Sequence, residues 1–215
     1  MSSVFDTVKL SKSDTPFTIP KNLTDLDSFE FDGLEGKTNL REMLDSSYTD
    51  AFVILKDSKI IFEEYQNEMK DNDLHLMNSV SKSFVGMLLG ILENEAKLST
   101  TDKVIKYIPE LQNSAFQETT IQHALDMTAA VKFTEDYNDS TSEFWHEAAV
   151  VGWRPDLKSK VSSTNLLEFM TSLKETSQKE FEMFDYRTVL TNILALTAER
   201  SCQVKFQDLL QTFIW

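Results

Sequence analysis

The sequence reads Met77-Asn78-Ser79-Val80-Ser81-Lys82-Ser83-Phe84 where a polar segment gives way to an apolar helix. It places a serine and a lysine three positions apart, so both side chains lie on one face of the predicted helix. A lysine withdrawn from water in such a place loses proton affinity and can help to activate the serine as a nucleophile. Many surface helices carry the same pair, so the rest of the chain has to decide its meaning.

The length and composition indicate one globular domain. The chain has 215 residues, enough for one solid core or for one domain with an inserted subdomain. Its 41% apolar and 11% aromatic content is typical of soluble globular proteins. The longest apolar stretch, 84–92, is too short to cross a bilayer, and the N-terminus has neither a basic nor an apolar leader region. We therefore expect a cytoplasmic protein with no membrane partner, and the periplasm stays open.

Charge and residue usage exclude several classes of function. A net charge of −14 would repel nucleic acid, and the acidic residues are spread along the chain. The single cysteine, Cys202, excludes an internal disulfide and cysteine-based metal sites, and His75, His123 and His146 have no metal-ligand spacing. Neither a P-loop nor a dinucleotide motif occurs. We expect no cofactor and no metal, and a homodimer stays open.

Hydrophobic periodicity predicts an irregular N-terminal arm over 1–35, then one hairpin and a series of helices. The hairpin joins 51–55 to 60–65, and its first arm is so apolar that we expect both of its faces to be buried. Helices are predicted over 38–44, 79–95, 99–109, 119–127, 142–151, 163–174, 189–200 and 206–213, with a loop over 131–141. A two-stranded hairpin is marginal alone, so it leans on the helices or belongs to a sheet whose other strands are not in this chain.

Six groups of segments occur in one order along the chain. They are 48–55 with 60–65; Leu76-Met-Asn-Ser79-Val-Ser-Lys82-Ser-Phe84; 86–92 with Lys97-Leu98; Tyr107-Ile-Pro-Glu-Leu111 with His123-Ala-Leu-Asp-Met-Thr128; Glu135-Asp-Tyr137 with Gly152-Trp-Arg-Pro155; and Phe184-Asp-Tyr186-Arg-Thr188 with 190–194. Together they resemble the serine β-lactamase-like hydrolases, and within them the branch of 6-aminohexanoate-dimer hydrolases and class C-like esterases. The resemblance runs from about residue 17 to the C-terminus.

The resemblance implies a fold and a catalytic set. The fold is α/β (α+β), β-lactamase/transpeptidase-like, over 36–215, with a hairpin from an antiparallel sheet and a mostly helical subdomain at about 96–180. Ser79 would be the nucleophile of an acyl-enzyme that water then hydrolyses, with Lys82 and Tyr186 as its partners. A tyrosine with an ordinary pKa near 10 can act as a base only if a neighbouring cation such as Lys82 depresses that pKa. Which of the two takes the serine proton stays open.

The implied substrate is a small amide or ester: a 6-aminohexanoate-type linear amide, a carboxylic ester or a β-lactam. Tyr137, Trp153 and Thr188 are the expected substrate-binding residues, and the linear amide rests on the two loops that carry the first two of them. Thr188 itself departs from the family, which usually has asparagine or serine there. Ala129-Ala130 and Ser201-Cys202 stand where glycines are common.

The third motif of the family, Lys-Thr-Gly or its equivalent on a strand, is not in this chain. It normally supplies the second oxyanion-hole N–H, and losing one such donor costs roughly 3 kcal/mol of transition-state stabilisation. We therefore expect the N-terminal portion of a longer hydrolase. The alternative is a catalytically impaired binding or sensor protein on the same scaffold.

Purely structural explanations compete with these roles. Ser79 could be a helix cap and Lys82 a solvated lysine. Tyr186 could be a core tyrosine at a helix entry and Tyr137 a surface tyrosine. Trp145 and Trp153 could be core tryptophans. A Ser-His-Asp triad stays open, because triads are assembled in space and not in sequence. We expect the acidic pairs 63–64 and 135–136 to be solvated surface, and Cys202 to be packed rather than reactive.

Overall fold

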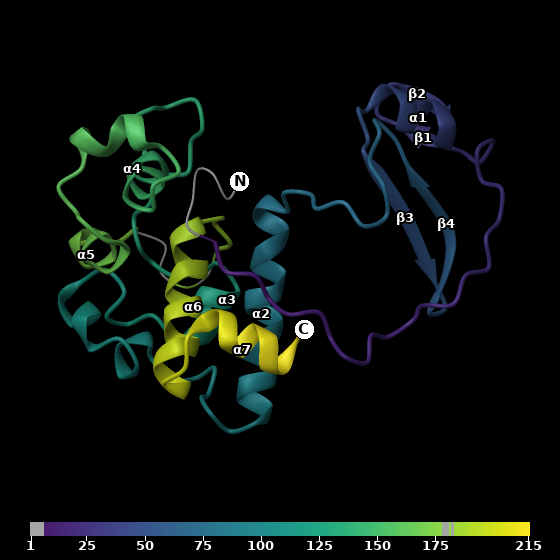
Figure 1. The fold of residues 1–215 in the computed structure, drawn as a ribbon. Coiled ribbons are helices and arrows are strands. Elements are labelled where there is room, and N and C mark those ends of the chain that lie inside the picture. Colours follow the sequence, from purple (N-terminus) through teal and green to yellow (C-terminus); the bar gives the residue numbers. More distant parts are fainter. Residues whose placement is uncertain (1–6, 178–180, 182) are drawn as a thin grey trace. The chain divides into compact units, whose positions relative to one another are not determined.

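The structure is a computed structural model that describes residues 7–177, 181 and 183–215. Its elements divide between two compact units, one formed by Ser13–Met77 and the other by Met1–Lys12 with Asn78–Trp215. All named strands lie in the first unit, and all named helices except α1 lie in the second (Figure 1).

The Ser13–Met77 unit is built on two antiparallel hairpins and one helix. In chain order its elements are strands β1 (Glu30–Gly33) and β2 (Gly36–Asn39), helix α1 (Leu40–Ser46), and strands β3 (Ala51–Lys56) and β4 (Lys59–Tyr65). Asn39 ends β2 and caps α1, because its side chain accepts the backbone N–H of Glu42 at 2.9 Å. The β3–β4 hairpin predicted from the sequence is confirmed, and the helix predicted over 38–44 begins at Leu40, because β2 occupies the residues before it.

The N-terminal arm is not irregular throughout. Besides forming β1, it runs along the outer edge of β4. The N–H of Ile60 donates to the carbonyl of Pro20 at 2.9 Å, and the N–H groups of Asn22 and Thr24 donate back to the carbonyls of Ile60 and Ile61 at 2.8 Å. This pairing covers one edge of the hairpin, which would otherwise be left with unsatisfied backbone groups.

One face of the β3–β4 hairpin packs on α1. The shared apolar cluster consists of Leu40, Leu44 and Phe62, with Phe52 and Ile54 partly buried beside them. The opposite face carries Val53 and Leu55, and no described element of this unit covers it. The prediction that the first arm is buried on both faces is therefore wrong for this unit, because α1 is the only helix available to cover the hairpin.

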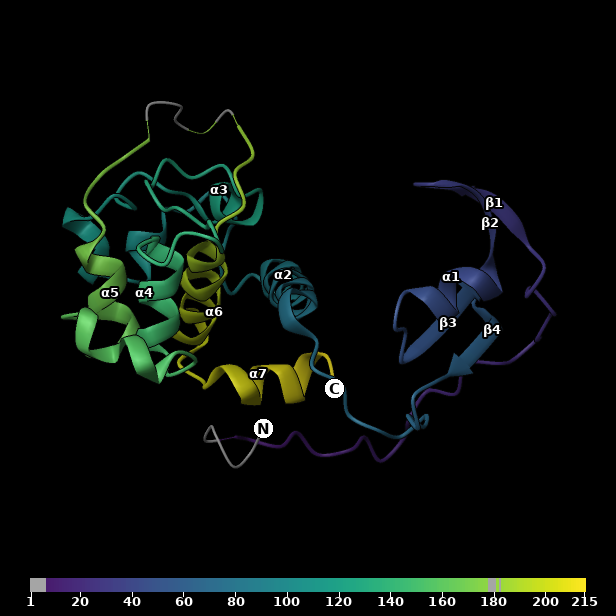
Figure 2. The ribbon, with the colours of Figure 1, turned by 90° about the horizontal axis from the view of Figure 1, so that it is seen from above.

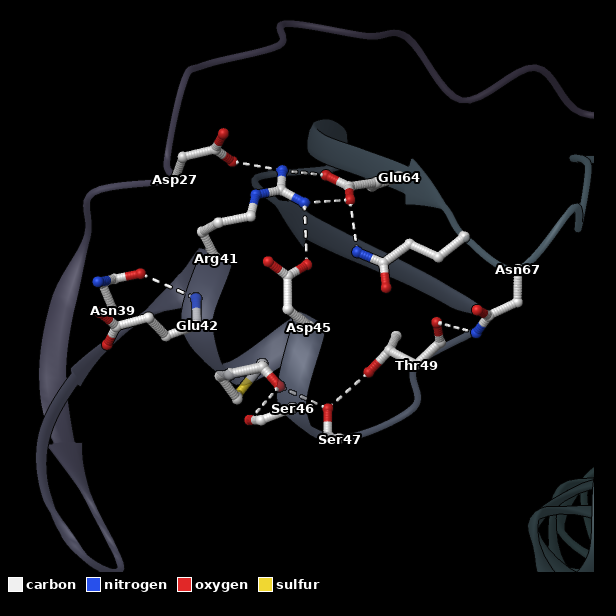
Figure 3. A network of polar contacts seen from close by, with 12 residues as sticks. Asp27, Asn39, Arg41, Glu42, Asp45, Ser46, Ser47, Thr49, Glu64 and Asn67 are labelled. Carbon is white, nitrogen blue, oxygen red and sulfur yellow. Dashed lines mark hydrogen bonds and ion pairs between the residues drawn. The ribbon is translucent and has the colours of Figure 1, made fainter.

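The acidic pair 63–64 is tied to cations. Arg41 on α1 donates to both carboxylate oxygens of Glu64, at 2.5 and 2.6 Å, and to Asp27 at 2.8 Å (Figure 3). Glu63 pairs with Lys21. Arg41 and Lys21 hold the pKa values of Glu64 and Glu63, respectively, below the usual range. The expectation of a solvated surface at 63–64 is wrong, because these carboxylates fasten α1 and the N-terminal arm to β4.

The second unit is helical. Its α-helices are α2 (Ser81–Asn94), α3 (Ile121–Leu125), α4 (Glu143–Val150), α5 (Leu166–Ser172), α6 (Thr188–Cys202) and α7 (Phe206–Phe213). Shorter 3₁₀ segments cover Asn78–Val80, Val104–Lys106, Pro109–Asn113 and Pro155–Lys160. The predicted helices are confirmed to within a few residues, except over 99–109, where only 3₁₀ turns form. No helix in the described part of the chain is long and apolar enough to cross a membrane.

The core of this unit lies between α2 and α6, which run side by side with α7 lying across both (Figures 1 and 2). Fully buried side chains repeat at three- and four-residue spacing on the facing sides of the two long helices. They are Leu88, Leu89 and Leu92 on α2, and Val189, Leu190 and Ile193 on α6. Cys202 packs against this core at the end of α6, as the sequence predicted.

Truncating the core of α2 is expected to destabilise the helical unit strongly. Leu89→Ala removes a side chain with no exposed surface, so we expect a loss of about 2–5 kcal/mol in the free energy of unfolding. Met87→Ala on the same helix is the control, because Met87 is 48% exposed and its loss should cost within about 0.5 kcal/mol. Urea denaturation measures both, and equal losses would contradict the assignment of the core.

Candidate active site

Ser79 and Lys82 lie together where α2 begins. Ser79 is in the 3₁₀ turn that precedes the helix, and the Nζ of Lys82 donates to the Oγ of Ser79 at 3.1 Å. Ser79 is exposed and Lys82 is partly buried. The positive end of the α2 dipole and the lysine both favour negative charge at this point. The contact predicted from the three-residue spacing is therefore present.

Tyr186 reaches this pair from a distant part of the chain. The Nζ of Lys82 lies 5.1 Å from the centre of the Tyr186 ring, which places the cation over the aromatic face. Ser79, Lys82 and Tyr186 line one cavity of about 350 Å³. Its other lining residues are Ser83, Gly86, Ala124, Leu125, Met127, Phe184, Thr191 and Leu194. The three predicted catalytic residues are thus brought together.

Hydrogen bonds on both sides of Tyr186 hold it in place. The N–H of Asp185 donates to the carbonyl of Met127 at 2.9 Å, just after α3. Arg187 donates to the carbonyl of Ala129 at 2.8 Å and to the carboxylate of Asp185 at 2.7 Å. Burial lowers the pKa of the Arg187 guanidinium, which remains charged because its ordinary pKa is so high. Ala129, standing where the family commonly has glycine, is buried beside this anchor.

Glu135 joins two of the predicted substrate-binding residues. Its carboxylate accepts the backbone N–H of Thr188 at 2.7 Å, the hydroxyl of Thr188 at 2.8 Å and the hydroxyl of Tyr137 at 2.8 Å. It therefore caps α6 from a separate loop, and the hydrogen bond that Tyr137 donates to it raises the pKa of Tyr137 to about 12. The expectation that Glu135 is solvated surface is wrong, whereas its neighbour Asp136 is exposed.

An aromatic cluster surrounds α4, and we call it the aromatic ledge. It consists of Tyr137, Phe144, Trp145 and Trp153. Phe144 is its buried centre, with ring centroids 4.9 Å from Tyr137, 4.9 Å from Trp145 and 5.9 Å from Trp153. Tyr137 and Trp153 are 57% and 51% exposed, so the ledge offers aromatic surface to a ligand. The ledge residues and Thr188 are not among those that line the cavity at Ser79.

Among the described residues of the helical unit, no histidine forms a hydrogen bond with Ser79. The Nδ1 of His123 accepts the backbone N–H of Thr120 at 3.2 Å in a capping box at the start of α3. His75 pairs with Asp50 at 3.0 Å. The Ser-His-Asp alternative therefore gains no support from the geometry. Within the described ranges, no group of three or more His, Cys, Asp or Glu side chains is arranged to hold a metal ion.

Glu147, a buried carboxyl group on α4, was not predicted from the sequence. Its side chain is 3% exposed, and its Oε1 accepts the Nδ2 of Asn192 on α6 at 2.8 Å. Its Oε2 has no partner among the described residues. Burial raises the pKa of Glu147 to about 7, opposed by the hydrogen bond from Asn192. The available signal was spacing, because Glu147 follows Phe144 by three residues and so shares the apolar face of α4.

Comparison with known proteins identifies the family and the fold of the chain. The sequence profile of the Beta-lactamase family matches residues 38–215. The chain is 32% identical over 178 residues to the 6-aminohexanoate-dimer hydrolase of Paenarthrobacter ureafaciens. That match covers 82% of this chain and 44% of the relative, so the chain spans less than half the relative's length.

Solved structures show the same fold. A Bacillus anthracis structure named for a 6-aminohexanoate-dimer hydrolase matches with a TM-score of 0.80 at 23% identity, over 96% of this chain and 54% of that one. FmtA from Staphylococcus aureus matches with a TM-score of 0.57 at 17% identity, over 81% and 46% of the two chains. EstCE1, a hydrolase with promiscuous acyltransferase activity, matches with a TM-score of 0.55 at 15% identity, over 81% of this chain and 48% of that one. The β-lactamase/transpeptidase-like fold predicted from the sequence is confirmed.

The buried acid makes a prediction about stability and pH. Glu147 binds its proton more tightly in the folded chain than in the unfolded one, so its contribution is fully present below about pH 4.5 and is lost as the pH rises to about 7. Over this pH range the free energy of unfolding of the wild-type chain should fall by on the order of 3 kcal/mol relative to that of Glu147→Gln, because glutamine cannot ionise. Urea denaturation at pH 4.5, 6 and 8 measures the difference. Parallel curves for the two chains would show that Glu147 is not held as a neutral acid.

Proposed function

The chain belongs to the Beta-lactamase family, and on this premise we propose that it is the Ser79-bearing portion of a serine hydrolase that cleaves a small amide or ester. The observation that carries the proposal is the shared cavity of Ser79, Lys82 and Tyr186, with the Nζ of Lys82 at 3.1 Å from the serine oxygen. A nucleophile, a group able to take its proton and a second proton carrier are the parts that acyl transfer needs.

In the proposed reaction, the Oγ of Ser79 attacks the substrate carbonyl carbon and its proton passes to Lys82 or Tyr186. The carbonyl electrons move to oxygen, and the N-terminal end of α2 stabilises the oxyanion. The oxyanion then collapses, the bond to the leaving amine or alcohol breaks, and the stored proton goes to that leaving group. Water adds to the acyl-enzyme in the same way, releasing a carboxylic acid and restoring Ser79.

The substrate we favour is a linear amide of the 6-aminohexanoate type. Two observations support it: the 32% identical relative carries that name, and the aromatic ledge offers an exposed apolar surface for an extended chain. In this proposal Tyr137 and Trp153 contact the substrate, and Thr188 acts through Glu135 by fixing the start of α6. A carboxylic ester and a β-lactam are the competing substrates of the same class, and the assay below separates them.

Active-site labelling tests the nucleophile. A fluorophosphonate probe should modify the chain at one site, and Ser79→Ala should abolish the modification. Ser81→Ala is the matched control, because Ser81 is a neighbouring serine whose hydroxyl donates to the carbonyl of Asn78 instead of lining the cavity. Intact-mass spectrometry measures both. Equal labelling of wild type and Ser79→Ala, or no labelling of a chain that melts cooperatively, would overturn the assignment.

Turnover tests the remaining roles. Lys82→Ala and Tyr186→Phe should each lower the labelling rate and the turnover of the preferred substrate by about 100- to 10,000-fold, because each removes a proton carrier. The 6-aminohexanoate dimer, a p-nitrophenyl ester and a chromogenic cephalosporin are compared at equal concentration. Fastest turnover of the dimer supports the linear amide, and fastest turnover of another substrate replaces it. Stoichiometric labelling with no turnover of any substrate would favour the binding or sensor protein.

A further inference from the structure

Glu147 is a buried ionisable group that the proposed reaction does not use. Its carboxyl lies between α4 and α6, with one oxygen bound to Asn192 and the other without a partner in the described part of the chain. An unsatisfied buried carboxyl costs stability, and an apolar residue at this position would avoid that cost. A buried polar group that costs stability in a packed interior calls for an explanation beyond packing.

Of the two helices joined by Glu147, one carries part of the aromatic ledge and the other begins near Tyr186. On one side, α4 contributes Phe144 and Trp145 to the aromatic ledge. On the other side, α6 begins two residues after Tyr186, and Asn192 lies one turn beyond Thr188. The bond between Glu147 and Asn192 therefore links the ledge to the helix that follows the catalytic tyrosine.

Only a neutral carboxyl suits this position. The charged groups that act on Glu147 from other elements are Glu135, which would repel a carboxylate, and Lys82, which would attract one only weakly. The described part of α6 offers it one amide donor, from Asn192. A single neutral hydrogen bond does not compensate an ionised carboxylate in an interior of low polarity.

Most of the charged groups on the elements packed against α4 have partners of their own, and Lys158 and Lys160 of the Pro155–Lys160 turn add two positive charges. Glu168 of α5 binds the backbone and hydroxyl of Thr164, and Arg154 pairs with Asp156. On α4 itself, Glu143 accepts the backbone N–H of Thr134. His146 is the direct neighbour of Glu147 on α4 and lies between it and Trp145 in the sequence. The experiment therefore has to separate Glu147 from His146.

We propose that Glu147, as a neutral acid bound to Asn192, is a positioning residue that holds the aromatic ledge against α6, and that its ionisation releases the ledge. The Ser79 chemistry would be untouched, since neither Glu147 nor the ledge lines the cavity at Ser79. The consequence for substrate binding rests on the proposed function, in which the ledge contacts the substrate. The movement of the ledge does not depend on that function and can be measured without turnover.

Tryptophan fluorescence tests the movement. In a Trp215→Phe background, Trp145 and Trp153 are the two remaining tryptophans, and both belong to the ledge. From pH 5.5 to 8.5 we expect one transition near pH 7 to a state that acrylamide quenches more readily, while far-UV circular dichroism stays constant. Glu147→Gln should abolish the transition and keep the less quenched state. His146→Gln should leave the transition in place.

A second variant covers the case in which Glu147→Gln folds poorly. Asn192→Ala removes the partner and should give the readily quenched state already at pH 5.5. A transition that survives Glu147→Gln, or disappears in His146→Gln, would overturn the role of Glu147. The role of Glu147 would also be overturned if the tryptophans of Asn192→Ala were as weakly quenched by acrylamide at pH 5.5 as those of the wild type.

Steady-state kinetics separates this role from the proposed function. For the 6-aminohexanoate dimer, the ratio of the wild-type KM to the KM of Glu147→Gln should rise about fivefold between pH 6 and 8. The corresponding ratio of kcat values should not change. A fluorescence transition as expected but no turnover would refute the hydrolase and leave the positioning role standing. Turnover with no transition linked to Glu147 would refute the positioning role alone.

Discussion

The close packing of α2 on α6 is the constraint on which the helical unit and its candidate site depend. The fully buried leucines of α2 and the aliphatic side chains of α6 fix the distance between the two helices. Ser79 lies in the 3₁₀ turn that precedes α2, Lys82 lies in the first turn of α2, and Tyr186 lies two residues before α6. The core therefore determines where the ends of the two helices meet, and the cavity at Ser79 is a consequence of that packing. The position of Lys82 over the Tyr186 ring follows from the same arrangement.

Residue spacing and hydrophobic periodicity predicted the features that depend on contacts between residues close in sequence. The three-residue spacing of Ser79 and Lys82 was sufficient to predict their contact, because helix geometry alone brings them together. Periodicity placed the long helices and the β3–β4 hairpin for the same reason. The family resemblance, and not periodicity, identified Tyr186, since its approach to Lys82 depends on contacts between residues about a hundred positions apart. The same long-range dependence explains why the hydrogen bond of the Thr188 hydroxyl to Glu135 was not predicted, and the substrate-binding role of Thr188 stays a prediction.

The errors concern side chains whose partners are remote in sequence. Glu63, Glu64 and Glu135 were expected to be solvated, because charged residues usually are. Each binds a group from another segment: Lys21 and Arg41 satisfy the first two, and Thr188 satisfies the third. The apolar first arm of the hairpin was expected to be covered on both faces, but α1 covers one face within its unit. Periodicity reports which face of an element is apolar and does not report what packs on it.

The capping of α6 by Glu135 also limits how this site can be redesigned or can diverge. The carboxylate that fixes the first turn of α6 comes from a loop about fifty residues earlier, and the same carboxylate orients Tyr137. A loop grafted from a relative would therefore change the start of α6 unless it brought its own acceptor for Thr188. Positions 135 and 188 are therefore coupled: a substitution at one position changes the effect that a substitution at the other has on the start of α6.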